Sequence, residues 1–385
     1  MKINFKSALY FLTTFLCMIP SFLLAAVDQK DMINKAVHTF MEKNQIPGVA
    51  VEVFNDGEPN SYYFGLANQE KKIPVSGKTI FELGSISKLM TSLLLAQEVD
   101  FANLQLNTPL REVLKDLPET FNNVTLQSLA THVSGLPFRP SQPINDRVEL
   151  EKYLNGFPKI TLPDKQWAYS NFGINVLGYA LETSTHKDFY QLYRSHILAP
   201  LKMQNLSEPK RKVSGFIAQG YDKEGKPASA VGPGLLPAAG GLKASAEDMQ
   251  RFLSAAIGLP KTPMRIFYPM RMTQSIYVKL SNHMQGLGWQ IHPMDKSKIG
   301  NLFTEATNPL ALGTLNVLEI EQRPMFDPNA LIDKTGGTDG FRSYIAVIPN
   351  KKSGVVILAN KFVPSDEIVK LGREILLKMT NIIDT

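Results

Sequence analysis

The sequence predicts a mixed α/β fold of the α+β kind: one antiparallel sheet formed by both ends of the chain, flanked by helices, with an inserted, mainly helical subdomain. Strand-like apolar runs bounded by turn residues, each with a neighbouring helix, occur near both termini, whereas the middle is rich in helical periodicity. With 385 residues, 44% of them hydrophobic and 20% charged, the chain can bury a large core without a disulfide or metal.

The amino terminus has the pattern of a secretory signal. Lys2 and Lys6 precede the uncharged stretch 7–27, which ends near the small residues Ala25 and Ala26. The stretch is long enough to span a bilayer as an uncleaved anchor, but the small residues favour cleavage. We therefore expect residues 1–26 to be a signal peptide and residues 27–385 to form a periplasmic catalytic domain without a membrane segment. The single cysteine, Cys17, would leave with the signal.

The elements of the mature chain follow from periodicity and turn residues. A helix ending near Lys43, strands 49–54 and 62–65, and a C-terminal group of strand 341–348, turn 349–354, strand 355–359 and helix 365–379 are predicted. These elements assign the sheet part to about 27–106 and 211–385, and the helical insertion to about 107–210.

Charge and histidine patterns exclude several classes of function. The formal net charge is +6, but the basic residues are scattered and their densest run is only 210–212, so no nucleic-acid partner is expected. The six histidines show neither HExxH nor paired spacing, and no metal or other cofactor is expected.

Ser85 and Lys88 lie just before an apolar helical segment, 89–96. A serine and a lysine three residues apart share one helix face, so the amine can reach the hydroxyl. A buried lysine with a lowered pKa can take the serine proton without a histidine, and a helix N-terminus stabilises the negative charge that develops. Ser-x-x-Lys also occurs at 184–187 and 207–210, but neither precedes an apolar helix, so Ser85 is the expected nucleophile.

Two further motifs carry polar groups suited to the same chemistry. Tyr169 could shuttle a proton, and beside two lysines its phenol is expected to ionise readily, while Asn171 could hold a substrate carbonyl. Lys334 could hold a substrate carboxylate, and Gly336 permits close backbone approach. The same two patterns recur where a helix and a hairpin turn are expected, at 153–155 and 352–354.

In this order the three motifs resemble those of the active-site serine penicillin-recognising enzymes. More closely, the chain resembles the class C β-lactamase family and its relatives, the D-Ala-D-Ala carboxypeptidases and β-lactamase-like esterases. The resemblance runs through nearly all of the mature chain and implies the β-lactamase/transpeptidase-like fold. It includes the further stretches 129–137, 200–203, 220–221, 240–245, 247–249, 286–289 and 358–361.

The resemblance implies a catalytic role for four residues. Ser85 would be the acylated nucleophile, Lys88 and Tyr169 the general acid/base pair, and Lys334 a group that orients Tyr169 electrostatically. Which member of this coupled cluster is the base stays open.

The resemblance also implies how substrate is held. Asn171 would bind the substrate side-chain amide, and Thr335 would meet its carboxylate together with Lys334. Gly336 and Gly337 complete this binding strand, and the backbone N–H groups of Ser85 and Gly337 would form the oxyanion hole.

The implied reaction is hydrolysis of a β-lactam amide through an acyl-enzyme on Ser85, by a monomer acting on a small-molecule β-lactam or peptidoglycan-like substrate. A carboxypeptidase or penicillin-binding protein, an esterase, and a penicillin-binding sensor that does not hydrolyse remain alternatives. Class A is rejected because its ExxLN pattern, at 151–155, precedes the Tyr-Ser-Asn motif here.

Several departures from the class C pattern bear on substrate choice. Asp333 stands where histidine is usual, Gly240 where tyrosine is common, and Arg139 where glutamine is common. Asp339 and Arg342 stand where small residues are expected. Arg342 is a candidate for replacing carboxylate-binding residues that are absent after Lys361.

Overall fold

The computed structural model describes residues 29–160, 163–204, 215–230, 237–303 and 313–384. The expected signal peptide, Cys17 and the Ser-x-x-Lys pattern at 207–210 lie outside these ranges. Within them, no helix combines the length and apolar character needed to cross a bilayer.

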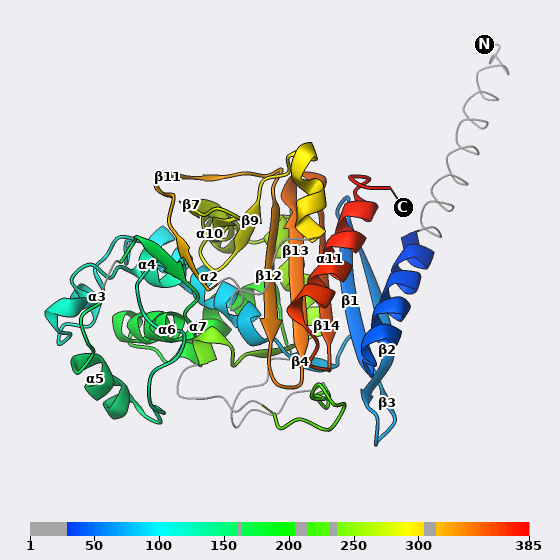
Figure 1. Ribbon diagram of the computed structural model, residues 1–385, viewed down its shortest axis with the longest axis horizontal. Helices are drawn as coiled ribbons and strands as arrows, with labels where there is room; N and C mark the ends of the chain where they lie inside the picture. Colours follow the sequence, from blue (N-terminus) through cyan, green and yellow to red (C-terminus); the bar gives the residue numbers. More distant parts are fainter. Residues whose placement is uncertain (1–28, 161–162, 205–214, 231–236, 304–312, 385) are drawn as a thin grey trace, which may run out of the picture.

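One ten-stranded antiparallel sheet forms the centre of the molecule, in the order β11-β7-β8-β9-β12-β13-β14-β1-β2-β3 (Figure 1). Strand β1, near the start of the chain, pairs with β14, near its end, with Val51 opposite Ile357. Both ends of the chain therefore build one sheet, which confirms the predicted fold class. The strands are β1 Gly48–Asn55, β2 Glu58–Asn68, β3 Ile73–Pro74, β7 Ser275–Lys279, β8 Met284–Gln285, β9 Gln290–His292, β11 Glu319–Phe326, β12 Leu331–Gly337, β13 Arg342–Ile348 and β14 Ser353–Ala359.

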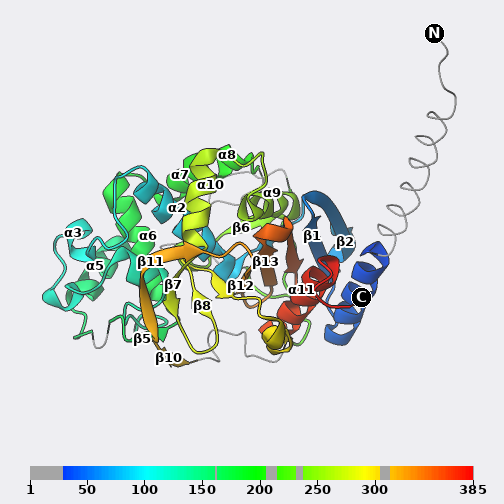
Figure 2. The same cartoon turned by 90° about the horizontal axis from the view of Figure 1, so that it is seen from above.

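Helices cover both faces of this sheet. The helix 29–44 and α11 (Ser365–Met379) lie on one side of β1 and β13, and α9 (Ala246–Ile257) lies on the other (Figure 2). Along β13 the side chains alternate between two cores: Tyr344 and Ala346 pack under α11, while Ile345 and Val347 pack in the larger core on the opposite face.

A helical part adjoins the second face of the sheet. Helix α2 (Ser87–Asp100) packs against α6 (Asn171–Thr185) and α10 (Met264–Thr273). Two short strand pairs, β4 with β6 and β5 with β10, connect this part to neighbouring segments. The remaining elements are α3 Leu110–Val113, α4 Leu126–Ala130, α5 Arg147–Asn155, α7 Phe189–Tyr193, α8 Ala199–Leu201, β4 Ile80–Glu82, β5 Gln166–Ala168, β6 Lys243–Ser245 and β10 Thr314–Asn316.

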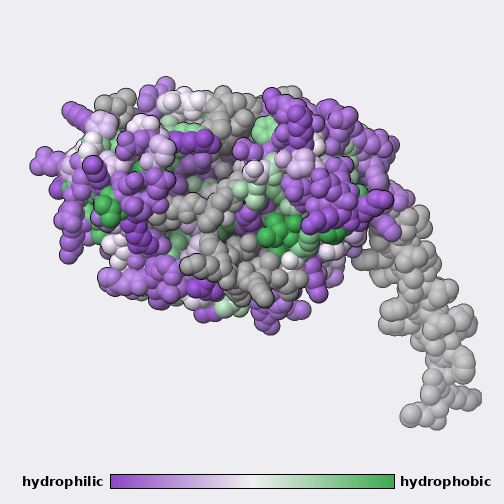
Figure 3. All heavy atoms as spheres, turned by 90° about the horizontal axis from the view of Figure 1, so that it is seen from below, coloured by the Kyte–Doolittle hydropathy of each residue, from purple (hydrophilic) through white to green (hydrophobic). Residues whose placement is uncertain are grey.

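Apolar side chains are concentrated inside. On the face drawn in Figure 3, the described residues are mainly hydrophilic, with hydrophobic side chains in small separate areas. Trp167 and Trp289 are both fully buried.

The element boundaries differ in detail from the predictions. Strand β13 begins at Arg342 rather than Phe341. Strand β14 begins at Ser353, two residues earlier than predicted, because the turn after β13 is a single 3₁₀ turn over Pro349–Lys351. Strand β2 is longer than the predicted 62–65, since its polar N-terminal half faces solvent but still pairs with β1.

Candidate active site

Ser85 lies in the turn between β4 and α2. The 3₁₀ turn η1 (Gly84–Ile86) leads directly into α2, so Ser85 stands at the start of this helix. The backbone N–H of Leu83 donates to the carbonyl of Leu242 at 3.0 Å, and the N–H of Leu242 donates to Ser87 Oγ at 3.1 Å. These bonds fix the turn against the segment that precedes β6.

Lys88 is completely buried one helical turn after Ser85. Its Nζ lies 3.1 Å from Ser85 Oγ and 2.7 Å from Asn171 Oδ1, and it also donates to the carbonyl of Ala239. Burial lowers the pKa of Lys88 well below its usual range, and the charge of Lys334 lowers this pKa further. A neutral amine has two N–H donors for Asn171 and Ala239, which leaves its lone pair for the Ser85 hydroxyl. The contacts of Lys88 therefore match those of a base.

Glycines allow β12 to lie directly against the Ser85 turn. Gly84 has a φ of +51°, and a Cβ added there would lie 2.4 Å from the backbone N of Gly337. A Cβ at Gly336 would lie 2.1 Å from the carbonyl O of Leu83. Ser343 Oγ donates to that same carbonyl at 2.7 Å. The backbone of Gly337 is thereby held next to the residue that precedes Ser85.

The Tyr-Ser-Asn segment connects β5 to α6. Ser170 caps α6: its Oγ accepts from the N–H of Gly173 at 2.7 Å and donates to the carbonyl of Pro137 at 2.6 Å. The Nζ of Lys88 lies 5.0 Å from the centre of the Tyr169 ring, and the Nζ of Lys334 lies 5.2 Å from it. The cap therefore presents the phenol of Tyr169 to both lysine amines.

The protonation of Tyr169 differs from the prediction. Burial raises the pKa of its phenol above the usual range, and a hydrogen bond with Ser85 offsets this only in part. The expectation that the phenol ionises readily is therefore wrong, because the loss of hydration on burial outweighs the hydrogen bond with Ser85. At neutral pH Tyr169 is a proton donor.

Lys334 is the central residue of β12 and is 1% exposed. Its Nζ donates to the carbonyl of Thr335 at 2.8 Å. Burial lowers the pKa of Lys334 to about 8, although the carboxylate of Asp333 acts in the opposite direction. Lys334 is thus mainly protonated at neutral pH and provides the positive charge near Tyr169.

Asp333 begins a buried ionic network beneath the strand. Its Oδ2 accepts from Arg373 Nε at 3.0 Å and Nη2 at 2.7 Å, and from the hydroxyl of Tyr344 at 2.7 Å, while His292 Nε2 lies 3.3 Å from Oδ1. Burial alone would raise the pKa of Asp333, but Arg373 and His292 more than offset it and the pKa is lowered. Asp333, at the position where class C enzymes usually have histidine, is therefore paired with Arg373 of α11.

Arg342 is occupied by backbone groups. Its guanidinium donates to the carbonyls of Val363, Thr338 and Phe341 and lies 3.9 Å from the centre of the Phe362 ring. These contacts favour a role in holding two loops together over the predicted role as a carboxylate ligand.

The structure brings the predicted residues together. Ser85, Lys88 and Asn171 are joined by the contacts of the Lys88 amine, and both lysines lie against Tyr169. Thr335, Gly336 and Gly337 continue β12 from Lys334 toward the Ser85 turn. The competing patterns lie elsewhere, at the end of α6 (184–187), in α5 (153–155) and at the hairpin turn (352–354).

Sequence reasoning missed two contributors. The carbonyl of Ala239 binds Lys88, but a backbone acceptor carries no side-chain signal. Arg373 lies forty positions beyond Asp333, and only the folded sheet shows that the two side chains meet.

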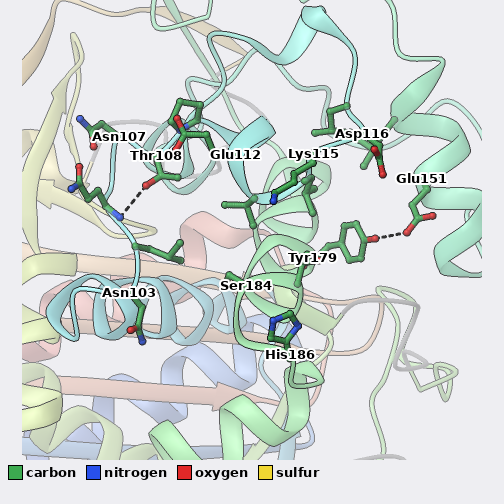
Figure 4. Close-up of a pocket in the computed structure, with 18 of the residues that line it drawn as sticks. Asn103, Asn107, Thr108, Glu112, Lys115, Asp116, Glu151, Tyr179, Ser184 and His186 are labelled. Carbon is green, nitrogen blue, oxygen red and sulfur yellow. Dashed lines mark hydrogen bonds between the residues drawn. The ribbon is translucent and has the colours of Figure 1, made fainter.

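A separate recess of about 1110 Å³ lies at the other end of α6 (Figure 4). Tyr179, Ser184 and His186 form part of its wall, and Tyr179 donates a hydrogen bond to Glu151. None of the eight predicted site residues lines it. Tyr179 follows Asn171 by eight helical residues, about 12 Å along the axis, so this recess is distinct from the Ser85 cluster.

Comparison with known proteins identifies the family of the chain. The family model described as Beta-lactamase matches residues 33–378. The chain belongs to the β-lactamase family. A β-lactamase from Pseudomonas fluorescens is 31% identical over 363 residues, which cover 92% of this chain and 99% of that protein.

Solved structures extend the likeness to three dimensions. The D-alanine carboxypeptidase from Burkholderia cenocepacia is 30% identical, with a TM-score of 0.82 over 91% of this chain and 99% of that one. A class C β-lactamase in complex with cefoxitin is 28% identical, with a TM-score of 0.83 over 91% and 98% of the two chains. The likeness therefore includes both hydrolases of β-lactams and a carboxypeptidase.

Proposed function

We propose that the chain is a serine β-lactamase of the class C type that hydrolyses the β-lactam amide through an acyl-enzyme on Ser85. The observation that carries this proposal is the fully buried Lys88 amine, 3.1 Å from Ser85 Oγ. Membership of the β-lactamase family and the class C structural relatives support it.

In the proposed reaction the Ser85 hydroxyl attacks the lactam carbonyl while its proton passes to the neutral amine of Lys88. Tyr169, protonated because it is buried, is the group that delivers a proton to the ring nitrogen as the amide bond breaks, and Lys88 replaces that proton. Water then attacks the ester carbonyl and releases the product and free Ser85. The positive charge of Lys334, which lies close to the Tyr169 ring, stabilises the negative charge that Tyr169 carries after it has given up its proton.

Substrate binding in this proposal uses the other predicted residues. Asn171 binds the substrate side-chain amide, and Thr335 with Lys334 meets its carboxylate. The N–H groups of Ser85 and Gly337 serve as the oxyanion hole, which the close approach of β12 to Gly84 supports. Each such donor is worth roughly 10²–10³ in rate.

Replacement of the nucleophile tests the proposal. Ser85→Ala should abolish covalent labelling by a fluorescent penicillin and hydrolysis of nitrocefin. Ser184→Ala is a matched control, since Ser184 also precedes a lysine by three residues but lies at the end of α6, where its hydroxyl donates to the carbonyl of Leu181. Stoichiometric labelling of the Ser85→Ala protein would contradict the assignment.

A D-Ala-D-Ala carboxypeptidase or penicillin-binding protein is the second candidate, favoured by the likeness to the Burkholderia cenocepacia carboxypeptidase. The same nitrocefin assay separates the candidates. Sustained turnover supports the lactamase, whereas a single burst followed by a stable acyl-enzyme supports a penicillin-binding protein or a sensor that does not hydrolyse. Ester cleavage without either supports an esterase.

We further propose that residues 1–26 are a cleaved secretory signal and that residues 27–385 act as one catalytic domain, monomeric in the periplasm. The proposed division has a sheet part, 27–106 and 211–385, and a helical insertion, 107–210. The basic residues followed by an uncharged stretch support the signal. N-terminal sequencing and light scattering of protein from a periplasmic extract test it; a start at Met1 or a dimeric mass would contradict it.

A further inference from the structure

His132 lies in the loop after α4, packed against the segment that carries Tyr169. It is 2% exposed, and its ring centre lies 4.5 Å from that of Tyr169 and 6.1 Å from that of Trp167. His132 has a φ of +63°, in the left-handed region that non-glycine residues seldom adopt. Both the ring and the backbone of His132 contact the segment that carries Tyr169.

Two hydrogen bonds from His132 hold the backbone on either side of Tyr169. The carbonyl of His132 accepts from the N–H of Ala168 at 2.9 Å, and its Nδ1 accepts from the N–H of Ser170 at 3.2 Å. The same loop continues this contact, because the carbonyl of Phe138 accepts from the N–H of Asn171 at 3.1 Å. Residues 168–171 therefore have little freedom to shift relative to the loop.

The ring does more than fill space. Because Nδ1 accepts, the neutral ring must carry its proton on Nε2, and that buried atom has no hydrogen-bond partner among the described residues. A buried donor without a partner costs free energy that an apolar side chain of similar shape would not. Packing alone therefore does not account for histidine at this position, whereas the acceptor at Nδ1 does.

The acceptor requires a neutral ring. Burial lowers the pKa of His132 well below its usual range, and the nearby Lys88, Lys334 and His283 lower it further. These groups come from α2, from β12 and from the segment between β7 and β8, and Tyr169 is the titratable group in direct ring contact. None of them is a carboxylate that would favour a protonated ring.

We infer that His132 is a positioning residue for Tyr169, which it places by holding the N–H groups of Ala168 and Ser170 and by packing on the phenol ring. The inference rests on the proposed function, in which Tyr169 delivers the proton to the leaving nitrogen. A displacement of the order of 1 Å in such a group can cost about 10²-fold in rate.

Two substitutions at this position separate the acceptor from the ring. Asparagine and glycine both tolerate the left-handed backbone and both remove the ring, but only asparagine keeps an acceptor close to the position of Nδ1. We expect His132→Gly to reduce the rate of acylation by a fluorescent penicillin about 10- to 100-fold. His132→Asn should recover most of that loss and keep the pH profile of the wild type.

His283 provides the matched control. It is 4% exposed and packs on Trp167 with ring centres 5.5 Å apart, but its Nδ1 faces Asn282 rather than the Tyr169 segment. His283→Gly and His283→Asn should lower stability while leaving the acylation rate close to that of the wild type. Amide hydrogen exchange at Ser170 gives a readout that needs no substrate: protection should fall in His132→Gly and persist in His132→Asn.

The measurements distinguish the positioning role of His132 from the proposed function of the chain. Unchanged acylation and Ser170 protection in His132→Gly would overturn the positioning role, as would equal losses in both His132 variants. A shifted pH profile in His132→Asn would also overturn it, because it would make His132 a titrating catalyst. A wild-type protein that acquires no label would contradict the proposed function, and the exchange measurement would still decide whether His132 holds this segment.

Discussion

Removal of Arg373 from the buried network beneath β12 should destabilise the fold strongly. The side chains of Arg373 and Asp333 are 1% and 2% exposed, and the guanidinium supplies two of the hydrogen bonds to the carboxylate. Arg373→Met would leave Asp333 with Tyr344 and His292 as partners for a buried negative charge. Breaking such a pair from one side costs about 3–5 kcal/mol.

The double replacement tests whether the uncompensated charge is the cause. Arg373→Met combined with Asp333→Asn removes both charges, and we expect it to recover at least about 2 kcal/mol of the loss, because neutral replacements of buried pairs are often tolerated. Urea unfolding followed by the fluorescence of the buried Trp167 and Trp289 measures the free energy of unfolding.

An exposed ion pair supplies the control. Lys43 is 63% exposed and lies 2.8 Å from Glu367, so Lys43→Met should change the free energy of unfolding by no more than about 1 kcal/mol. A loss of that small size for Arg373→Met, or a double variant as unstable as the single one, would refute the electrostatic reasoning.

Three further changes have defined outcomes. Gly336→Ala would place a Cβ 2.1 Å from the carbonyl O of Leu83, so the acylation rate should fall about 10²-fold; wild-type labelling would contradict this. Burial raises the pKa of Glu52 from 4.5 to about 7, so the folded state holds an extra proton in this interval and stability falls as pH rises through it. The free energy of unfolding of Glu52→Gln should therefore exceed that of the wild type by up to about 3 kcal/mol at about pH 8 and equal it at about pH 4. The same difference between the two proteins at both pH values, measured by urea unfolding, would contradict this. Burial lowers the pKa of Lys334 to about 8, so nitrocefin turnover should decline above that pH, and Lys334→Arg should move this decline upward; an unmoved alkaline limb would exclude Lys334 as its source.

The sequence was most informative where chemistry is local. Ser85 and Lys88 are one helical turn apart, so their meeting follows from helix geometry alone. The C-terminal strands and helix were likewise marked by turn residues and periodicity, and they are confirmed within one or two residues.

Contacts between distant segments and the effects of burial were not accessible in this way. The hydration that Tyr169 loses depends on packing around the ring, so proximity to lysines predicted the wrong direction for its pKa. The contact between Asp333 and Arg373 arises because α11 crosses β12 and β13 on one face, which no spacing in the chain encodes. The short strands β8 and β9 have two and three residues, too few for a period to be visible.

The pairing of β1 with β14 has a consequence for the order of events during synthesis. Val51 is synthesised early and its partner Ile357 near the end. Strand β1 therefore has no β14 to pair with until nearly the whole chain has been synthesised. The catalytic cluster forms equally late, because Lys334 lies in β12 and this strand packs against the Ser85 turn. Folding dominated by such distant contacts is slow. Ser85 and Lys334 are therefore brought together only once the strands from the end of the chain have joined the sheet.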